Sequence, residues 1–473
     1  MPRHIREPLA VNPEKRAMSR TFFFDSAWLP DGWRRNVRVS VRAGVIERVA
    51  LDAVPHPGDE RSSRAIAGLP NVHSHAFQRS MAGLAERRGP QGADDFWSWR
   101  EVMYRFLARM GPDDLEAIAA YAYADMLEAG FTSVGEFHYL HLSPEGAPYG
   151  NPAELALRHA AAADLTGIGL TLLPVFYESS GFGGAAPTPG QRRFITDLDT
   201  FADIVARVRA HLGQGAHRNT GIAPHSLRAV TADHLHTLLC QNPPGPVHIH
   251  AAEQMKEVED CLAYCGLRPV EWLLRRTEVT AQWCLVHATH LTAEETAELA
   301  RSGAVAGLCP LTEANLGDGI FPAAAYHGAQ GRWAIGTDSH ILLDAAGELR
   351  QLEYSQRLTL RSRNILASPG QHSTGETLYQ TALAGGAQAL GLPVGAIAKG
   401  CRADFLILDA AHPDLAGRGE DAAVDTWVFA AGRSLIRDVI AAGRTVVSNR
   451  RHIERDRIDA AFRRTMTGLL RAA

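Results

Sequence analysis

Two histidines, His73 and His75, stand one residue apart at the end of an apolar, strand-like run. In an extended segment the side chains of residues i and i+2 point to the same side of the strand. Both imidazoles can therefore face one point in space, which is the arrangement that a metal ion needs. The pair alone does not specify a metal site, because a single histidine at a strand end is more often a hydrogen-bonded structural residue.

Residues suited to metal binding and proton transfer also follow later strand-like runs. The run 246–250 ends in His248-Ile-His250 and is followed by Glu253, and two further runs end at His287 and at Asp338. A catalytic zinc site takes three or four nitrogen or oxygen ligands and keeps a position for water. Spacing alone does not decide between His248 and His250. The predicted ligand set is His73, His75, His250 and Asp338.

The ligand types and the scarcity of lysine bear on the kind and number of metal ions. Imidazole together with carboxylate suits zinc or iron. Barrel sites that hold two metals often bridge them with a carboxylated lysine, and Lys15, Lys256 and Lys399 all lie away from the predicted strand ends. We therefore expect one divalent metal ion, Zn²⁺ in the first place and Fe²⁺ as the alternative.

The elements that must position these residues alternate in type along the middle of the chain. Helix-like segments separate the strand-like runs, as at 112–130, where Pro112 and acidic residues open a helix that Gly130 ends. Eight strands with helices between them indicate an α/β fold, a (β/α)8 barrel of the TIM type with its site at the C-terminal strand ends. The expected strands end near residues 73, 138, 176, 225, 250, 287, 308 and 338.

Strand-rich segments at both ends of the chain flank the predicted barrel. Runs within 21–50 and 403–447, including one at 426–429, have the residue types of strands. They suggest that the two termini pair into one small discontinuous β-sandwich domain. The predicted divisions are a flexible tail at 1–17, the β domain at 18–67 and 393–453, the barrel at 68–392 and a C-terminal helix at 454–473.

Composition and charge argue against several classes of partner. The net charge is −4 and like charges form no block, which argues against nucleic acid and against an anionic membrane surface. No run approaches the ~20 apolar residues of a membrane span, and the N-terminus lacks the apolar core of a signal peptide. The six cysteines are scattered without a zinc-knuckle or disulfide spacing, which favours a reduced, cytoplasmic setting.

Short motifs around the predicted ligands carry a resemblance to a known family. They are residues 70–75 (Pro-Asn-Val-His-Ser-His), 250–253 (His-x-x-Glu), 287–291 (His-Ala-Thr-His-Leu), 337–340 (Thr-Asp-Ser-His) and the tail segment 395–409. Together they resemble the amidohydrolase superfamily in its deaminase-like branch. The resemblance extends from about residue 20 to about residue 450 and implies the barrel, its β domain and the metal.

Within that superfamily, further stretches resemble the formimidoylglutamate deiminases of histidine degradation. In the aromatic-ring deaminases of the branch, the stretch at 224–228 usually reads Pro-His-Ala-Pro-Tyr, whereas here Ser226-Leu-Arg228 follows the histidine. That departure favours an anionic substrate over a nucleobase. The stretches that carry this narrower resemblance are 73–79, 96–100, 136–139, 224–228 and 310–319.

The resemblance implies hydrolysis of the C=N bond of N-formimidoyl-L-glutamate to N-formyl-L-glutamate and ammonia. In such a reaction Asp338 would take a proton from the attacking water and Glu253 would carry one to the departing ammonia. His287 would orient the water and stabilise charge. Arginine binds carboxylates bidentately and would select a dicarboxylate. The expected substrate-binding residues are Gln78, Arg100, Tyr139, His225 and Arg228.

Two other interpretations stay open at this point. One is a different amidohydrolase reaction, the deamination of a nucleobase or a guanidine-like compound, against which Ser226-Leu-Arg228 counts. The other is a barrel that has lost its metal and serves as an assembly scaffold, against which the complete ligand set argues. The resemblance also suggests a homodimer.

Overall fold

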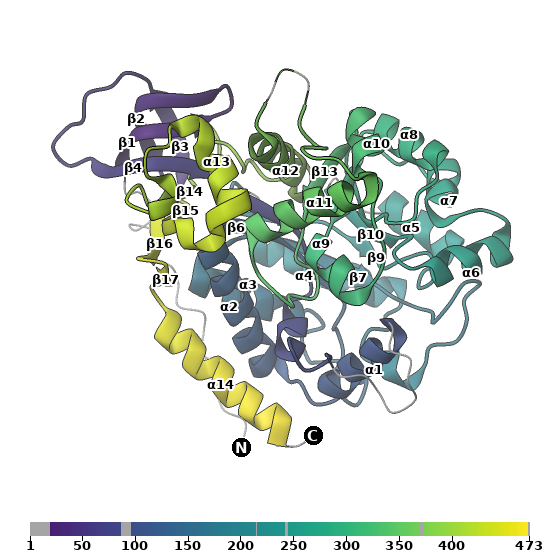
Figure 1. Cartoon of the computed structure of the whole chain (residues 1–473). Coiled ribbons are helices and arrows are strands. Elements are labelled where there is room, and N and C mark those ends of the chain that lie inside the picture. Colours follow the sequence, from purple (N-terminus) through teal and green to yellow (C-terminus); the bar gives the residue numbers. More distant parts are fainter. Residues whose placement is uncertain are drawn as a thin grey trace, which may run out of the picture.

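The structure is a computed structural model that describes residues 19–86, 96–213, 215–241, 245–368, 370 and 372–471. The tail predicted at 1–17 lies outside these residues. Figure 1 shows two bodies: a group of strands from the middle of the chain surrounded by helices, and a sheet to one side that holds the first and the last strands. Among the described helices, none combines the length and the apolar character that a membrane span requires.

Parallel strands form the centre of the larger body. They are β5 (Leu69–Ser74), β6 (Phe131–His138), β7 (Gly169–Phe176), β8 (Arg218–Thr220), β9 (Ala223–Pro224), β10 (Val247–Ala251), β11 (Trp283–His287), β12 (Val305–Leu308) and β13 (Arg332–Ile335). One sheet has the order β5-β6-β7-β8 with β9 beside β7, and the other has the order β10-β11-β12-β13. Isolated parallel bridges join the two sheets at both seams, Ser74 to Asp338 and Ile222 to Val247. Every predicted strand position is therefore occupied, the fourth by the short pair β8 and β9.

Helices lie between and after the parallel strands, and most of them cover the outside of the two sheets. They are α1 (Phe96–Leu107), α2 (Pro112–Ala129), α3 (Glu154–Thr166), α4 (Leu198–Leu212), α5 (Ala232–Gln241), α6 (Met255–Cys265), α7 (Pro269–Arg276), α8 (Ala293–Ser302), α9 (Pro310–Leu316), α10 (Ala323–Gly328), α11 (Ala345–Leu360), α12 (Thr374–Leu390), α13 (Ala423–Thr426) and α14 (Arg455–Arg471). Local sequence sets their ends: α2 begins with Pro112 and acidic residues and ends at Gly130, whose φ of 105° suits glycine. Shorter helical turns are η2 (Ala76–Met81), η3 (Pro189–Gln191), η4 (Pro413–Leu415), η5 (Glu420–Ala422), η6 (Trp427–Ala431) and η7 (Gly432–Leu435).

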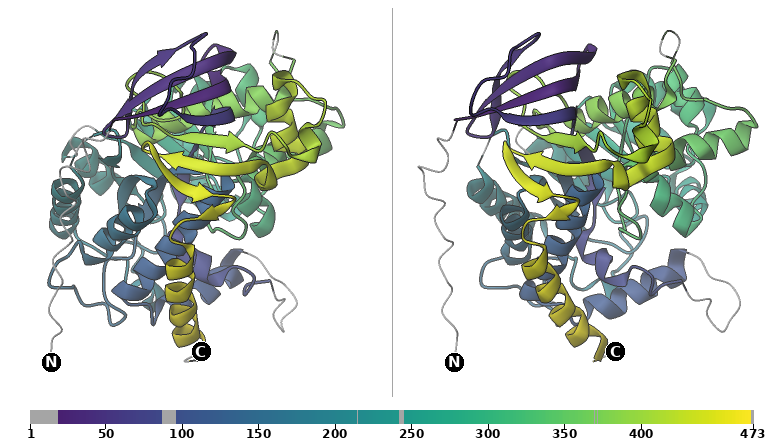
Figure 2. Two further views of the ribbon diagram at one scale, coloured as in Figure 1. Left: turned by 90° about the vertical axis from the view of Figure 1, so that its left-hand side faces the viewer. Right: turned by 60° about the vertical axis from the view of Figure 1, so that its left-hand side comes forward.

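Both ends of the chain contribute to one mixed sheet of eight strands. The strands are β1 (Ser19–Leu29), β2 (Gly32–Arg42), β3 (Val45–Ala50), β4 (Glu60–Ala67), β14 (Phe405–Leu408), β15 (Ile436–Ala441), β16 (Arg444–Ser448) and β17 (Arg451–His452). Their order is β17-β16-β15-β14-β4-β1-β2-β3, and β4 pairs parallel with β1 and antiparallel with β14. Figure 2 shows the purple N-terminal strands and the yellow C-terminal strands side by side. This arrangement is consistent with the predicted small β domain built from both termini.

The strand predicted at 426–429 is wrong. Thr426 ends α13 and the π-helical turn η6 follows it. Trp427 is fully buried, and its ring packs edge-on against Tyr379 of α12 with the centroids 5.8 Å apart. Tryptophan, valine and phenylalanine favour strands, but that preference is weak against the burial of a large aromatic ring in tertiary contacts.

Arg402 connects the mixed sheet to the larger body. Its side chain is only 2% exposed and forms an ion pair with Asp404 at 2.7 Å. Its guanidinium also donates to Thr132 O at 2.9 Å and to Gly167 O at 2.7 Å, at the start of β6 and after α3. Because both terminal nitrogens of the guanidinium find acceptors and only Nε has none among the described residues, the buried charge is well compensated in place.

We expect Arg402→Met to lower the free energy of unfolding by roughly 3 kcal/mol, because it leaves Asp404 as an unpaired buried charge. Equilibrium unfolding in urea measures this loss. The matched control is Arg437→Met, which removes an ion pair between Arg437 and Asp438 in which the arginine side chain is 36% exposed. Such surface pairs contribute about 0–1 kcal/mol. Equal effects of the two substitutions would contradict the role given to Arg402.

Candidate active site

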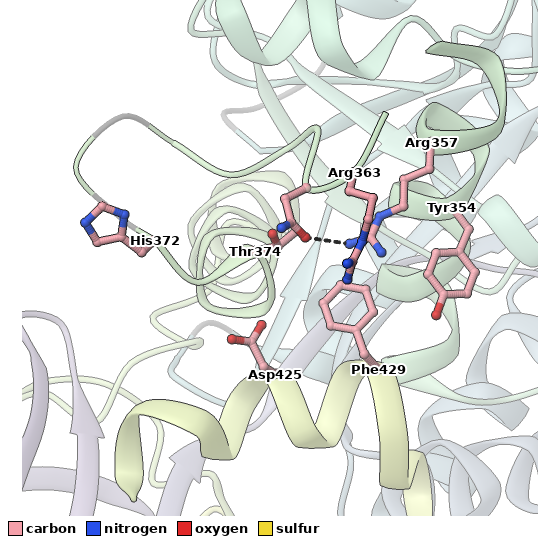
Figure 3. A pocket seen from close by; sticks show the side chains of 8 residues that line it. Tyr354, Arg357, Arg363, His372, Thr374, Asp425 and Phe429 are labelled. Atoms are coloured by element: carbon pink, nitrogen blue, oxygen red, sulfur yellow. Dashed lines mark hydrogen bonds between the residues drawn. The ribbon is translucent and has the colours of Figure 1, made fainter. Parts of the chain in front are cut away.

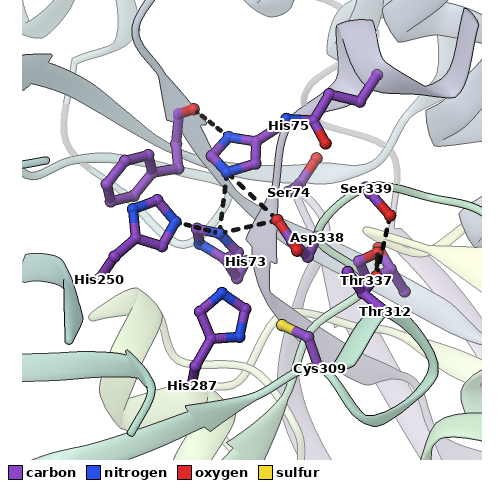
Figure 4. A network of polar contacts seen from close by, with 12 residues as sticks. His73, Ser74, His75, His250, His287, Cys309, Thr312, Thr337, Asp338 and Ser339 are labelled. Carbon is purple, nitrogen blue, oxygen red and sulfur yellow. Dashed lines mark hydrogen bonds and ion pairs between the residues drawn. The ribbon is translucent and has the colours of Figure 1, made fainter. Parts of the chain in front are cut away.

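The predicted metal ligands come from three strands that end at the same face of the parallel sheets. His73 lies on β5, His75 directly after it, His250 on β10, and Asp338 shortly after β13. Backbone hydrogen bonds seat the aspartate beside the histidines: Asp338 N donates to His73 O at 3.0 Å and His75 N donates to Asp338 O at 3.1 Å. Figure 4 shows the four side chains pointing toward one another.

The ligand atoms of these four side chains converge on one point. His73 Nε2 lies 3.1 Å from His75 Nε2 and 3.1 Å from His250 Nε2. Asp338 Oδ1 lies 3.3 Å from the Nε2 atoms of both His73 and His75. All four residues are buried. Three imidazole nitrogens and one carboxylate oxygen form a donor set that suits zinc or iron.

Hydrogen bonds among the four side chains cannot explain the short distances between their ligand atoms. His75 Nδ1 donates to Phe137 O at 2.9 Å and His250 Nδ1 donates to His225 O at 3.1 Å, which leaves a lone pair on each Nε2. Burial, with the neighbouring His75, lowers the pKa of His73 to about 3, so the His73 ring is neutral and has a single proton to offer. One proton cannot bridge two imidazole lone pairs and a carboxylate. A cation can satisfy all four ligand atoms, so these residues fit a divalent metal ion.

The structure separates His248 from His250, which spacing had left equivalent. His248 Nε2 bonds to Ala389 O at 2.8 Å, whereas His250 Nε2 faces His73. Both side chains lie on the same side of β10, and only the residue nearer the carboxyl end of the strand reaches the cluster. His250 is therefore the member of the pair that fits the ligand set.

His287 and Glu253 lie side by side at the edge of the cluster. His287 Nε2 is 3.7 Å from Glu253 Oε1, and its ligand atom lies within 4.8 Å of those of His73, His250 and Asp338. Burial lowers the pKa of His287, but Glu253 and two further carboxylates outweigh burial and raise that pKa to about 10. Burial raises the pKa of Glu253 to about 7. A carboxyl group that titrates near neutral pH beside an imidazolium is suited to proton transfer.

The predicted substrate-binding residues line the same pocket as the catalytic ones. Its wall is built from η2, from α1 in the long connection before α2, and from the segments that follow β6, β7 and β9. Apolar and aromatic side chains that sequence reasoning did not single out for this role complete it. The predicted residues in this pocket are Gln78, Arg100, Tyr139, His225 and Arg228, and the additional ones include Met103, Tyr104, Tyr177 and Phe194.

Some polar atoms of the pocket have no protein partner. Gln78 Nε2 donates to the hydroxyl of Tyr139 at 3.0 Å, while Gln78 Oε1 is buried without a hydrogen-bond partner among the described residues. The Nε atom of Arg228 is buried and unpartnered in the same sense. Buried polar atoms in proteins are nearly always hydrogen-bonded. A ligand with both hydrogen-bond acceptors and donors would complete this pocket.

Two carboxylates in the segment 310–319 escaped sequence reasoning. Glu313 Oε1 lies 3.2 Å from His287 Nδ1, and Asp318 Oδ1 accepts from Gln254 Nε2. Burial, together with the charge of Glu253, raises the pKa of Asp318 to about 9. The sequence did single out this segment, but only by resemblance. A glutamate in the first turn of a helix is common for reasons of capping alone, so its position gave no sign of a contact with His287.

A second hollow lies on the outer surface between α11, α12 and η6 and has a volume of about 310 Å³ (Figure 3). One of the arginines that line it, Arg357, is engaged within the protein, because it donates to Glu353 at 2.7 Å and to Asn364 at 2.9 Å. The guanidinium also lies over the rings of Tyr354 and Phe429, 5.4 and 5.2 Å from their centroids. The residues suited to catalysis are gathered at the strand ends and not in this hollow.

The fold and the ligand cluster agree with the result of comparison with known families. The model described as "Amidohydrolase family" matches residues 64–446. The chain therefore belongs to the amidohydrolase family. A second model, described as "Formimidoylglutamate deiminase HutF, N-terminal domain", matches residues 20–63, which run from β1 into β4.

Individual relatives resemble the chain over nearly its whole length. The formimidoylglutamate deiminase of Pseudomonas aeruginosa is 50% identical over 450 residues, which are 95% of this chain and 99% of that protein. The crystal structure of an amidohydrolase from Brucella melitensis is 51% identical and has a TM-score of 0.90, covering 95% of this chain and 100% of that chain. A zinc-bound adenosine deaminase structure from Xanthomonas campestris, 24% identical, shares the fold with a TM-score of 0.78 over 96% of this chain and 98% of that chain.

Proposed function

We propose that this chain hydrolyses N-formimidoyl-L-glutamate to N-formyl-L-glutamate and ammonia. The observation that carries the proposal is a single pocket in which a metal-ligand cluster and a proton-transfer pair lie beside two arginines. The two arginines suit the binding of a dicarboxylate. The metal-ligand cluster and the proton-transfer pair suit the hydrolysis of an amidine. The half-identical deiminase of Pseudomonas aeruginosa supports this choice of substrate over the other reactions of the family.

The cofactor is one divalent metal ion, Zn²⁺ or alternatively Fe²⁺, held by His73, His75, His250 and Asp338. When bound, such an ion acts as a Lewis acid that makes hydroxide available near neutral pH. The neutral state of the His73 ring suits this role, because a protonated imidazole has no lone pair for a metal.

The remaining steps involve three side chains, of which two transfer protons and one stabilises charge. Asp338 has a pKa below its usual range, because hydrogen bonding to His73 and the nearby imidazoles outweigh burial, so it is a carboxylate that can accept the proton of the attacking water. Glu253, with a pKa raised to about 7, carries a proton to the amidine nitrogen, and the C–N bond breaks as ammonia leaves. The carboxylates around His287, Glu253 first among them, raise its pKa and favour the protonated ring, which stabilises the negative charge that develops after the water attacks.

The two carboxylates of the substrate bind to the arginine side of the pocket. The guanidinium groups of Arg100 and Arg228 match carboxylates bidentately, and Gln78, Tyr139 and His225 supply further hydrogen bonds. Binding both carboxylates there places the formimidoyl group toward Glu253 and the metal ligands. A neutral nucleobase would offer no carboxylate to these guanidinium groups.

Steady-state ammonia release tests the proposal. N-formimidoyl-L-glutamate is assayed beside guanine and cytosine, and metal content is determined on protein purified without added metal. We expect ammonia from N-formimidoyl-L-glutamate but not from guanine or cytosine, and one metal ion per chain. Release from guanine or cytosine but not from the amidine would assign another reaction of the family, and protein without metal or turnover would favour a scaffold.

We expect Arg228→Met to raise KM for N-formimidoyl-L-glutamate by roughly 10²-fold with kcat changed far less. The substitution removes a charge-assisted contact to a carboxylate that is present in both ground state and transition state. The control is Arg207→Met on the exposed face of α4, where Arg207 pairs with Asp203. A KM within twofold of the parent value would remove Arg228 from the substrate pocket.

Our proposal for the wider architecture follows from the same observations. The two parallel sheets together form a (β/α)8 barrel, supported by the bridges at both seams, and the domain divisions follow the limits of 68–392 for the barrel.

The protein acts on a small molecule, without nucleic acid or membrane as a partner, and works in the cytoplasm as a homodimer. Unpaired cysteines throughout the described residues and the modest net charge support this setting. Light scattering on the purified chain tests the dimer.

A further inference from the structure

The segment after β12 places the carboxylate of Glu313 at the edge of the active site. Pro310 is the first residue of α9 and Cys309 precedes it, and Glu313 lies in the first turn of the helix. Glu313 is only 5% exposed, and its Oε1 atom accepts from Cys309 N at 2.8 Å. The same oxygen lies 3.2 Å from His287 Nδ1. One carboxylate oxygen therefore joins the start of α9 to the histidine.

His287 has two contacts that hold its buried ring: the ring stacks on that of His250, with the centroids 5.6 Å apart, and Nδ1 meets Glu313. This histidine is the last residue of β11 and has a φ of 66°, a left-handed conformation that is uncommon for a side chain with a Cβ atom. Its other nitrogen, Nε2, faces Glu253 Oε1 at 3.7 Å. With Nδ1–H donated to Glu313, rotation about the Cβ–Cγ bond is restricted and Nε2 is directed into the pocket.

We propose that Glu313 is a positioning residue for the reaction: it holds the His287 ring in the orientation that presents Nε2 to Glu253 and to the substrate. The inference rests on the proposed role of His287 and deepens it. A hydrogen bond to an ionised carboxylate is shorter and roughly twice as strong as one to a neutral acceptor. The charge of Glu313, and not only its shape, therefore contributes to the orientation.

Helix capping is the competing explanation for Glu313, and the chain offers a matched comparison. Glu295 also lies in the first turn of its helix, α8, one position nearer the N-cap than Glu313 is in α9. It is 4% exposed and accepts from the N-cap nitrogen, Thr292 N, at the same distance of 2.8 Å. Its carboxylate pairs with Arg268 at 2.8 Å and accepts from Glu271 N at 3.2 Å, and neither of these residues lines the pocket. Glu295 thus has the capping function of Glu313 without the contact to a catalytic histidine.

The experiment compares Glu313→Gln with Glu295→Gln. Glutamine keeps an oxygen for the N-cap nitrogen but offers His287 a neutral acceptor shared with that donor. We expect Glu313→Gln to lower kcat for N-formimidoyl-L-glutamate about tenfold or more, with KM within threefold and metal content unchanged. Glu295→Gln lowers Tm without lowering kcat. A Glu313→Gln protein with the kcat of the parent would overturn the inference and leave Glu313 as a cap.

A double-mutant cycle separates positioning from a general structural effect. If Glu313 acts through His287, then Glu313→Gln lowers kcat in the parent and has no further effect in a His287→Asn background. Equal loss in both backgrounds would contradict the inference. Should Glu313→Gln fail to fold, Glu313→Asp replaces it in the cycle, because the shorter side chain keeps the charge but cannot reach both donors. Failure of the proposed function itself is distinguishable, since the parent protein would then release no ammonia from N-formimidoyl-L-glutamate.

Discussion

Glu253→Gln is expected to lower kcat for N-formimidoyl-L-glutamate by at least ~10²-fold while one metal ion per chain is retained. Glutamine has the size of glutamate but cannot take up and release a proton. Glu253 stands 3.7 Å from His287 and its pKa is raised to about 7, so it can exchange protons at the pH of the reaction. It is three residues from His250 and contributes no atom to the four-ligand cluster. The loss should therefore appear in kcat, with little change in KM or in metal content.

The control for this experiment is Glu257→Gln, one helical turn further along. Glu257 is also buried, and its Oε2 atom accepts from Glu253 N at 3.2 Å, so it supports the backbone there without lining the pocket. We expect a smaller loss of kcat from this variant, less than tenfold. Activity assays at saturating substrate and metal analysis on both proteins decide the outcome. A Glu253→Gln protein with near-parental turnover would remove Glu253 from the mechanism.

The ligand cluster was predictable because it depends on rules that act over short stretches. His73 and His75 share a side of an extended segment, and parallel strands bring their carboxyl ends to one face. His73, His75 and Asp338 could thus be proposed as ligands from their places relative to strand ends. The choice between His248 and His250 needed the structure, because it depends on how far each side chain lies along β10.

The features that escaped prediction depend on backbone conformation and on contacts between distant segments. Asp338 has a φ of 43° and Ala252 has a φ of 52°, and these left-handed conformations turn the chain at the strand ends. The residue pattern does not predict them. Glu313 reaches His287 because α9 begins directly after β12, the strand that pairs with β11. At Trp427 the sequence predicted a strand that the structure does not contain. The residue type favours a strand, but the ring is buried against α12 from a helical turn.

Removal of the metal is expected to abolish turnover, with a loss greater than ~10³-fold, and to lower Tm. Neighbouring ligand atoms of His73, His75, His250 and Asp338 lie 3.1 to 3.3 Å apart, and these side chains carry too few protons to hydrogen-bond all of them. Repulsion between these lone pairs must be relieved by protonation or by displacement of a side chain. Because an ion binds the folded chain and not the unfolded one, adding it back should raise Tm by an amount that depends on its concentration.

Dialysis against a chelator, followed by titration with Zn²⁺ or Fe²⁺, measures both effects. Activity and Tm should recover together and saturate at one equivalent per chain, as the absence of a bridging lysine from the strand ends also indicates. A pair of variants on β10 makes the test specific: His250→Gln should lose the metal, whereas His248→Gln, which alters only the contact to Ala389, should keep it. Saturation at two equivalents, or retention of the metal by His250→Gln, would contradict the four-ligand site and with it the assignment of the remaining pocket residues to substrate.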